Sequence, residues 1–300
     1  MIKKITQFSN RLCESHKVVE CDEANSSTSI RKSSLLPTEM VGLARTGLVF
    51  SFFFLLSFTT NKLKKFIPPG TTQISENFFA DETEVSNGAW QEYEASIKTK
   101  YGKNSAEYAA ALPDTLVWRQ KNSYNEPYVQ YYYRHPAYKD FPVVGISYEQ
   151  ANAFCKWRTE KVKQFYLIAH KKEINCEYRL PTQQEWEMLA DIAPSVISKK
   201  GLNEKGLPTF NHRWMTDSIY KKYLNEKKIG LDVTAPVYSY WKNTYGLFNL
   251  YGNVAEMINE KGICKGGGWC HLLDECRAGK NMVYEKPTSW LGFRCVCIVK

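Results

Sequence analysis

The pattern of apolar and polar positions predicts three helices, each starting at a recognisable N-cap. In the first, Ser86 precedes an apolar stripe formed by Trp90, Tyr93 and Ile97. A serine at this position can accept hydrogen bonds from backbone N–H groups of the first turn. The stripe recurs every three to four residues, as expected for one face of a helix that packs on a core. An amphipathic helix is therefore predicted after Ser86.

The other two predicted helices start with capping boxes, in which the N-cap side chain and the side chain three residues later bond to each other's backbone N–H. Ser147 and Gln150 form one box, directly after the apolar segment PVVGI, which predicts a short strand. Thr182 and Glu185 form the other. Each box precedes an inward-facing stripe at helical spacing. The stripe residues are Ala151, Phe154, Cys155, Arg158 and Val162 in the first helix and Trp186, Leu189 and Ala190 in the second.

Two long stretches lack such periodicity. Residues 101–135 are rich in Tyr, Asn and Pro, which predicts a long ordered loop. From residue 235 onward Gly, Asn and aromatic residues dominate, and the pattern predicts short strands without an amphipathic helix. Residues 67–300 are therefore predicted to form one compact α+β domain with little regular secondary structure.

The N-terminal part of the chain has a different character. Residues 1–39 lack apolar periodicity and are predicted to be disordered. An apolar run at 48–58 follows, flanked by Arg45 and Lys62. It is shorter than the ~20 residues that a membrane span needs, and it fits a signal peptide or a short signal anchor. We therefore expect residues 1–66 to direct export to the cell envelope, where the protein is periplasmic or anchored to the membrane through this segment.

The positive charge is concentrated in this N-terminal part. The whole chain carries a formal charge of +9, and residues up to Phe66 contribute ten Lys or Arg against five Asp or Glu. The remainder is therefore only weakly basic. Nucleic-acid binding surfaces gather basic residues on the folded domain, often with interleaved aromatic residues. No nucleic-acid partner is expected.

Seven of the nine cysteines lie in the predicted domain, and three of them fall within CKGGGWCHLLDEC at 264–276. Export would place them in an oxidising compartment, where disulfides persist. An odd number leaves at least one thiol unpaired within the domain. On residue types alone, the segment 264–276 is open to three interpretations: disulfide halves, metal ligands or a reactive pair.

Six motifs resemble, in the same order, those of the formylglycine-generating enzyme/sulfatase-modifying factor family. They are DETEVSNGAW, FPVVGISYEQANAFCKW, YRLPTQQEWEMLA, APVYSYWKNTYGLFNLYGNVAEM, KGGGW and LGFRC. The resemblance covers residues 67–300 and implies the C-type-lectin-like α+β fold of that family. The stretch 112–145 is similar to a branch found in gliding-motility and protein-secretion lipoproteins of the bacterial envelope, which carry the domain without known catalysis.

The segment GLFNLYGNVAEM offers oxygen ligands at close spacing. Asn249 and Glu256 carry side-chain oxygens, and Gly252 allows the backbone to turn its carbonyls inward. Calcium takes six to eight such ligands. The resemblance implies a structural calcium held by the side chains of Asn249 and Glu256 and the carbonyls of Gly252 and Val254. The alternative is a turn whose polar side chains only satisfy backbone groups.

The resemblance also bears on Cys270 and Cys276. In catalytic members of the family, two cysteines bind copper(I), for which thiolates are suitable ligands. Those cysteines follow a Gly-Gly-Ser and have four residues between them. Here Gly268 stands at the serine position, and five residues separate Cys270 from Cys276. The resemblance further implies a disulfide between Cys155 and Cys295, with Cys176 and Cys297 as the next candidate pair.

Two functions are compatible with these motifs. One is a non-catalytic, exported or membrane-tethered domain that binds envelope protein partners in a gliding or secretion assembly. The other is a copper-dependent oxidase that converts a cysteine of sulfatase-like substrates to formylglycine, with Cys270 and Cys276 as its catalytic residues. The departures at Gly268 and Cys270 favour the first function.

Overall fold

The computed structural model describes residues 66–119, 125–190, 209–213 and 233–300. The chain divides into two units, residues 1–66 and residues 67–300. The apolar run at 48–58 lies outside the described residues. Among the described helices, none combines the length and the apolar character that a membrane crossing requires.

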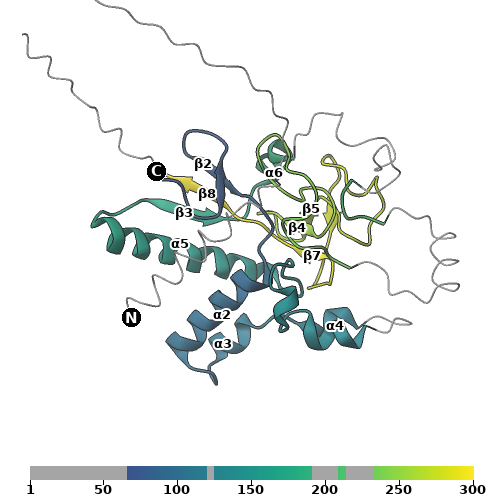
Figure 1. The fold of residues 1–300 in the computed structure, drawn as a ribbon, viewed down its shortest axis with the longest axis horizontal. Coiled ribbons are helices and arrows are strands. Elements are labelled where there is room, and N and C mark those ends of the chain that lie inside the picture. The colour runs from purple at the N-terminus through teal and green to yellow at the C-terminus, as the bar shows by residue number, and fades with distance from the viewer. Residues whose placement is uncertain (1–65, 120–124, 191–208, 214–232) are drawn as a thin grey trace, which may run out of the picture. The chain divides into compact units, whose positions relative to one another are not determined.

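One antiparallel sheet joins the beginning, the middle and the end of the domain. Its strand order is β1-β2-β8-β3, visible in the upper part of Figure 1. The strands are β1 (Thr71–Gln73), β2 (Phe78–Asp81), β8 (Val296–Val299) and β3 (Cys176–Arg179). Cys297 pairs with Phe79 on one side and with Tyr178 on the other. Strand β8 is therefore held between strands that are far apart in the sequence.

A second sheet has even shorter strands. Its order is β6-β5-β4-β7, and only the β4–β7 pair is parallel. The strands are β4 (Ala255–Met257), β5 (Ile263–Lys265), β6 (Met282–Val283) and β7 (Leu291–Gly292). Short strands carry few ladder hydrogen bonds, so loops, side-chain bonds and packing must fix this half of the domain. The prediction of only short strands after residue 235 is confirmed for the described residues.

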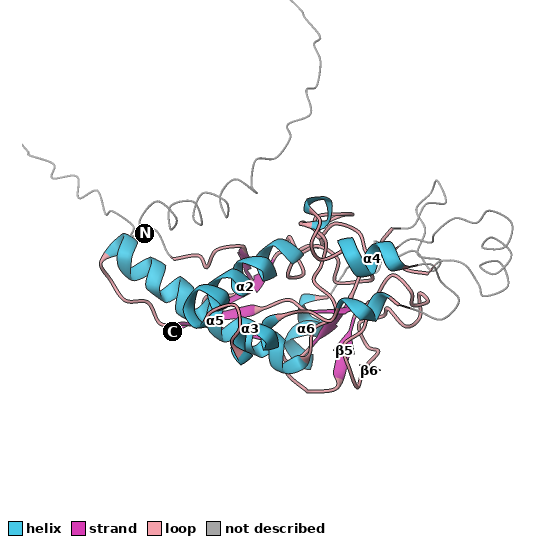
Figure 2. Ribbon diagram, turned by 90° about the horizontal axis from the view of Figure 1, so that it is seen from below, coloured by secondary structure: helices cyan, strands magenta, loops and turns pink. Residues whose placement is uncertain are grey.

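The three predicted helices are present, and each has its predicted cap. They are α2 (Asn87–Tyr101), α5 (Tyr148–His170) and α6 (Gln183–Leu189). Ser86 caps α2, and both capping boxes are formed. Helix α5 lies against β3, where Thr159 Oγ1 accepts a hydrogen bond from the Tyr178 N–H at 2.8 Å. Figure 2 shows α2, α3 and α5 grouped at one end of the domain, with β5 and β6 at the other.

The prediction of a long loop over 101–135 was wrong. This stretch contains α3 (Ala106–Ala111), the 3-10 helix η1 (Thr115–Trp118) and α4 (Glu126–Tyr131), and the 3-10 helix η2 (Pro136–Tyr138) follows. Each is about one turn long, too short to show an apolar period, and caps and packing stabilise such helices. Ser105 and Asp114 cap α3 and η1, and Trp118 packs on Tyr132 with ring centroids 4.6 Å apart.

The predicted strand at PVVGI does not form either. Pro142 makes only an isolated bridge with Ser86, and the Val143 N–H donates to Val85 O at 2.9 Å. Gly145 then turns the chain with a φ of +73°, and a Cβ there would lie 2.2 Å from Asp114 O. The segment is buried and extended, but this turn ends it before a ladder can develop.

Phe154 is the centre of an aromatic cluster on α5, and its truncation tests the packing. Its ring stacks on Trp90 at 5.5 Å and meets Phe293 edge-on at 5.6 Å. We expect Phe154→Ala to lower the free energy of unfolding by about 3–5 kcal/mol, because it leaves a cavity among rigid rings. Leu167→Ala, at an exposed position of the same helix, is expected to cost about 0.5 kcal/mol or less. Urea denaturation measures both, and equal losses would contradict the assignment.

Candidate functional site

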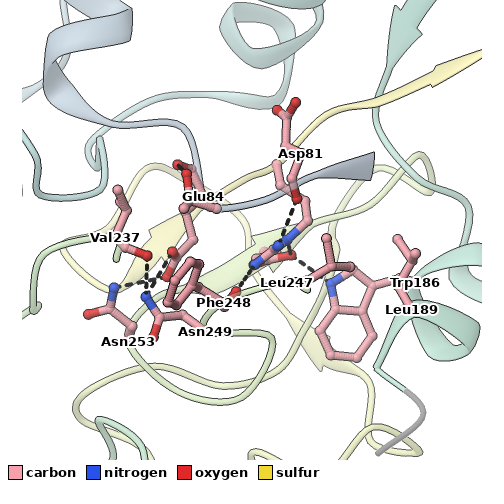
Figure 3. A network of polar contacts seen from close by, with 12 residues as sticks. Asp81, Glu84, Trp186, Leu189, Val237, Leu247, Phe248, Asn249 and Asn253 are labelled. Carbon is pink, nitrogen blue, oxygen red and sulfur yellow. Dashed lines mark hydrogen bonds and ion pairs between the residues drawn. The ribbon is translucent and has the colours of Figure 1, made fainter. Parts of the chain in front are cut away.

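A fully buried ion pair lies where the two sheets meet. The guanidinium of Arg294, between β7 and β8, donates to the carboxylate of Glu256 in β4 at 2.6–2.9 Å. The Trp186 indole N–H, from α6, donates to the same carboxylate at 2.7 Å. The Arg294 guanidinium also donates to the carbonyls of Asp81 and Phe248. Figure 3 shows Asp81, Phe248 and Trp186 around this pair.

A second buried carboxylate belongs to Glu84, just after β2. Its two oxygens accept hydrogen bonds from the side-chain amides of Asn249 at 3.1 Å and Asn253 at 2.9 Å. Figure 3 shows the three side chains together. The pKa of Glu84 is raised to about 8, mainly because the carboxyl group is buried. Repulsion from Glu256 raises this pKa as well, and attraction to Arg294 partly offsets both effects. Two carboxylates thus share one guanidinium, and Glu84 needs a proton or a further cation to be neutralised.

The four residues predicted to hold calcium lie in this region, but the two side chains contact different partners. The Asn249 amide nitrogen donates to Glu84 and, at 2.9 Å, to Val237 O. Its Oδ1 is buried and has no partner among the described residues. Both oxygens of Glu256 are bonded to Arg294, and one also to Trp186. The unpaired Asn249 oxygen and the surplus negative charge fit a hard cation, which Glu256 would have to share with Arg294.

The backbone of the predicted calcium turn is tightly constrained. Gly252 has a φ of +72°, and a Cβ there would lie 2.2 Å from Asn211 O. Its N–H donates to Gly266 O at 2.8 Å, and the Trp269 N–H donates to Asn253 O at 2.8 Å. The turn therefore lies beside the glycine run that leads to Cys270. Val254 is buried and leads directly into β4.

Cys270 and Cys276 lie in the same loop as free thiols. Burial raises the pKa of each to about 12. Both are therefore protonated at neutral pH, whereas copper(I) binds thiolates. The Cys270 Sγ lies 3.7 Å from His271 Nδ1. A Cβ on Gly267 would lie 2.5 Å from the Cys276 Sγ, so that sulfur packs closely against the loop backbone.

A serine at Gly268, as in the catalytic members, would be tightly packed. A Cβ at Gly268 would approach Trp290 O, Asn253 O and Ala255 N at 3.0, 3.2 and 3.3 Å. All three are backbone atoms, so a serine requires the loop to shift. The Gly268 N–H instead donates to His271 Nδ1 at 3.0 Å. The imidazole of His271 thus satisfies the Gly268 N–H as a hydrogen-bond acceptor, but it does not replace the serine hydroxyl.

The predicted disulfide partners Cys155 and Cys295 are brought together. Their sulfurs lie 3.4 Å apart, both are buried, and both are free thiols in this structure. The disulfide itself stays a prediction. Sequence reasoning missed Glu84 and Arg294. Glu84 is the third acidic residue of DETE, a pattern typical of an exposed segment, and Arg294 is a single charge in GFRC. Such charges are rarely buried without a partner.

Comparisons with known proteins agree with the motifs. The family model of the sulfatase-modifying factor enzyme 1-like domain matches residues 52–298. A bovine formylglycine-generating enzyme is 27% identical over 189 residues, 52% of this chain and 44% of that protein. The bovine inactive C-alpha-formylglycine-generating enzyme 2 is 26% identical over 176 residues, 52% of this chain and 50% of that protein. The chain thus spans about half the length of these relatives. Among solved structures, PvdO from Pseudomonas aeruginosa has a TM-score of 0.46 and 15% identity, over 74% of this chain and 80% of that one.

Removal of the negative charge of Glu256 tests the buried ion pair. We expect Glu256→Gln to lower the free energy of unfolding by about 3–5 kcal/mol, because it leaves the buried Arg294 guanidinium without its counter-charge. The matched control is Glu177→Gln, whose carboxylate is exposed and 3.5 Å from the Lys300 ammonium. Its expected effect is about 0.5 kcal/mol or less. Chemical denaturation compares the two, and a small effect at Glu256 would show that Arg294 does not depend on it.

Calcium is tested by thermal unfolding with and without chelation. We expect EDTA to lower the unfolding midpoint by roughly 5–10 °C and excess calcium to restore it, because a ligand that binds only the folded state stabilises it. Asn249→Ala removes the unpaired oxygen and should abolish the response. Asn104→Ala, at an exposed turn, should retain it. A melting curve that EDTA leaves unchanged would support the turn without calcium.

Proposed function

The chain belongs to the sulfatase-modifying factor enzyme 1-like domain family and has the predicted α+β fold of formylglycine-generating enzymes; from this premise, we propose that it is a non-catalytic member. We further propose that it is exported or tethered to the membrane and binds envelope protein partners in a gliding or secretion assembly. Three structural arguments support this proposal.

The crowding at Gly268 is the observation that carries the non-catalytic assignment. An oxidase of this family needs a polar group beside two metal-binding thiolates. The hydroxyl is absent at Gly268, and three backbone atoms lie 3.0–3.3 Å from the position of a Cβ there, so a serine would need a shift of a few tenths of an ångström. A preorganised site tolerates errors of about 0.5 Å. The displacement of one cysteine by a residue, about 3.8 Å along the chain, is far larger than that.

The protonation state of the thiols gives the same conclusion. Because desolvation raises the pKa of Cys270 and Cys276 to about 12, a metal would have to displace a proton from each thiol. Catalytic cysteines lie in surroundings that favour the thiolate, whereas Cys276 is buried and Cys270 is only partly exposed. One relative is named as an inactive formylglycine-generating enzyme, and that name supports a non-catalytic role within this family.

The stretch 112–145 supports partner binding. It is the part that is similar to envelope gliding and secretion proteins, and three of its large apolar side chains, Leu112, Leu116 and Tyr131, are exposed. Where such side chains gather into one patch, they mark a protein contact. We therefore propose that this stretch contributes to the partner-binding surface.

The copper-dependent oxidase remains the competing function, because two cysteines occur in the expected loop. Its test uses the purified protein, copper, oxygen and a peptide that carries a sulfatase-type cysteine motif. We expect no conversion of the peptide cysteine to formylglycine by mass spectrometry, because the loop lacks the hydroxyl at Gly268 and the surroundings of Cys270 and Cys276 disfavour their thiolates. An active formylglycine-generating enzyme, assayed in parallel, is the positive control. Conversion that Cys276→Ser abolishes would establish the oxidase instead.

A further inference from the structure

Strand β8 and the residue before it carry two cysteines that face α5. Val296 and Ile298 pack with Trp186 on one face of the sheet. Side chains alternate along a strand, so Cys295 and Cys297 point to the opposite face. Helix α5 lies on that face, where Cys155 reaches to 3.4 Å from the Cys295 sulfur. Cys295 is thus the neighbour of Cys155, and Cys297 is left for another partner.

The second cysteine has its own neighbour across the ladder. In the antiparallel pairing of β3 and β8, Tyr178 lies opposite Cys297, and Cys176 lies opposite Val299. Cys176 is therefore the diagonal neighbour of Cys297 on the same face. Diagonal neighbours in an antiparallel sheet are about 7–8 Å apart, and their Cβ atoms are somewhat closer. Cys176 and Cys297 are both fully buried, and both are free thiols in this structure.

The two thiols interact directly. A hydrogen bond with Cys297 lowers the pKa of the Cys176 thiol, and the nearby Lys163 ammonium lowers it further. The same contact raises the pKa of the Cys297 thiol. The folded structure thus holds the two sulfurs as neighbours, at the place where a disulfide between them would lie.

We propose that Cys176 and Cys297 form a disulfide in an oxidising compartment, beside the Cys155–Cys295 pair, so that β8 is joined covalently to β3 as well as to α5. The oxidant is a small-molecule or protein disulfide. Either cysteine, as its thiolate, attacks it and forms a mixed disulfide, releasing one thiol. The other cysteine then displaces the second thiol and closes the bond, so two protein thiols are oxidised and one external disulfide is reduced. Because both sulfurs are fully buried, the exchange takes place during folding, before α5 covers the sheet.

The bond is tested on full-length protein refolded from the reduced state in a glutathione redox buffer. Free thiols are then alkylated under denaturing conditions without reductant, and the protein is digested with trypsin. One tryptic peptide, 295–300, contains both Cys295 and Cys297, so wild-type protein does not distinguish the pairings. The double variant C155A/C295A removes the other pair. We expect a cross-linked species that joins peptides 173–179 and 295–300 and disappears on reduction.

Wild-type protein and two single variants keep the result interpretable if the double variant does not fold. Wild-type protein should give a three-peptide species that joins 140–156, 173–179 and 295–300. In Cys176→Ala, peptide 173–179 should be absent from the cross-linked species, and Cys297 should become alkylated. Cys264→Ala, which removes a buried cysteine of β5, should leave the species unchanged. Reduction should also lower the unfolding midpoint by several degrees more in wild type than in Cys176→Ala. Full alkylation of Cys176 and Cys297 in the refolded wild-type protein would overturn the proposal.

Discussion

The ion pair between Arg294 and Glu256 is the contact on which most of the fold depends. Arg294 lies between the two sheets, and its five N–H donors reach a carboxylate of β4 and the carbonyls of Asp81 and Phe248. Neither sheet has strands long enough to determine its own position. A planar guanidinium with fixed donor directions can specify geometry in a way that apolar contacts do not. Its net effect on stability is small, because desolvation offsets the attraction, but loss of one partner is costly.

The buried polar network also fixes the loop of Cys270, through the turn at residues 249–254. Glu84 orients the amides of Asn249 and Asn253, and the backbone carbonyl of Asn253 accepts the N–H of Trp269. The same turn bonds to Gly266 through the Gly252 N–H. The path of the glycine run is therefore determined by a buried polar network and not by the cysteines. A buried carboxylate that lacks a full counter-charge makes this network sensitive to whatever neutralises it, either a proton or a cation.

Sequence patterns predicted what local interactions determine and missed what distant contacts determine. The caps at Ser86, Ser147 and Thr182 involve neighbours within three residues, so α2, α5 and α6 could be located from the sequence. Helices α3 and α4 span too few residues to show a period. Glu84 and Arg294 are 210 residues apart, and no local rule indicates that both are buried at one place. The motifs could locate the loop of Cys270, but the crowding at Gly268 arises from backbone atoms of two other segments, 253–255 and Trp290.

The distribution of these contacts explains how such a domain can lose its chemistry and retain its fold. In the segment 266–271, the bonds to the rest of the protein are mainly made by the backbone: Gly266 O accepts the Gly252 N–H, and Trp269 N donates to Asn253 O. Within the loop, the Gly268 N–H donates to the imidazole of His271, and the His271 N–H donates to Gly268 O. The Cys270 side chain contributes a contact only to the adjacent His271. A side chain that carries no structural bond can move or disappear without altering the loop path. The path of this loop thus does not depend on the Cys270 side chain, which is what the proposed non-catalytic role requires.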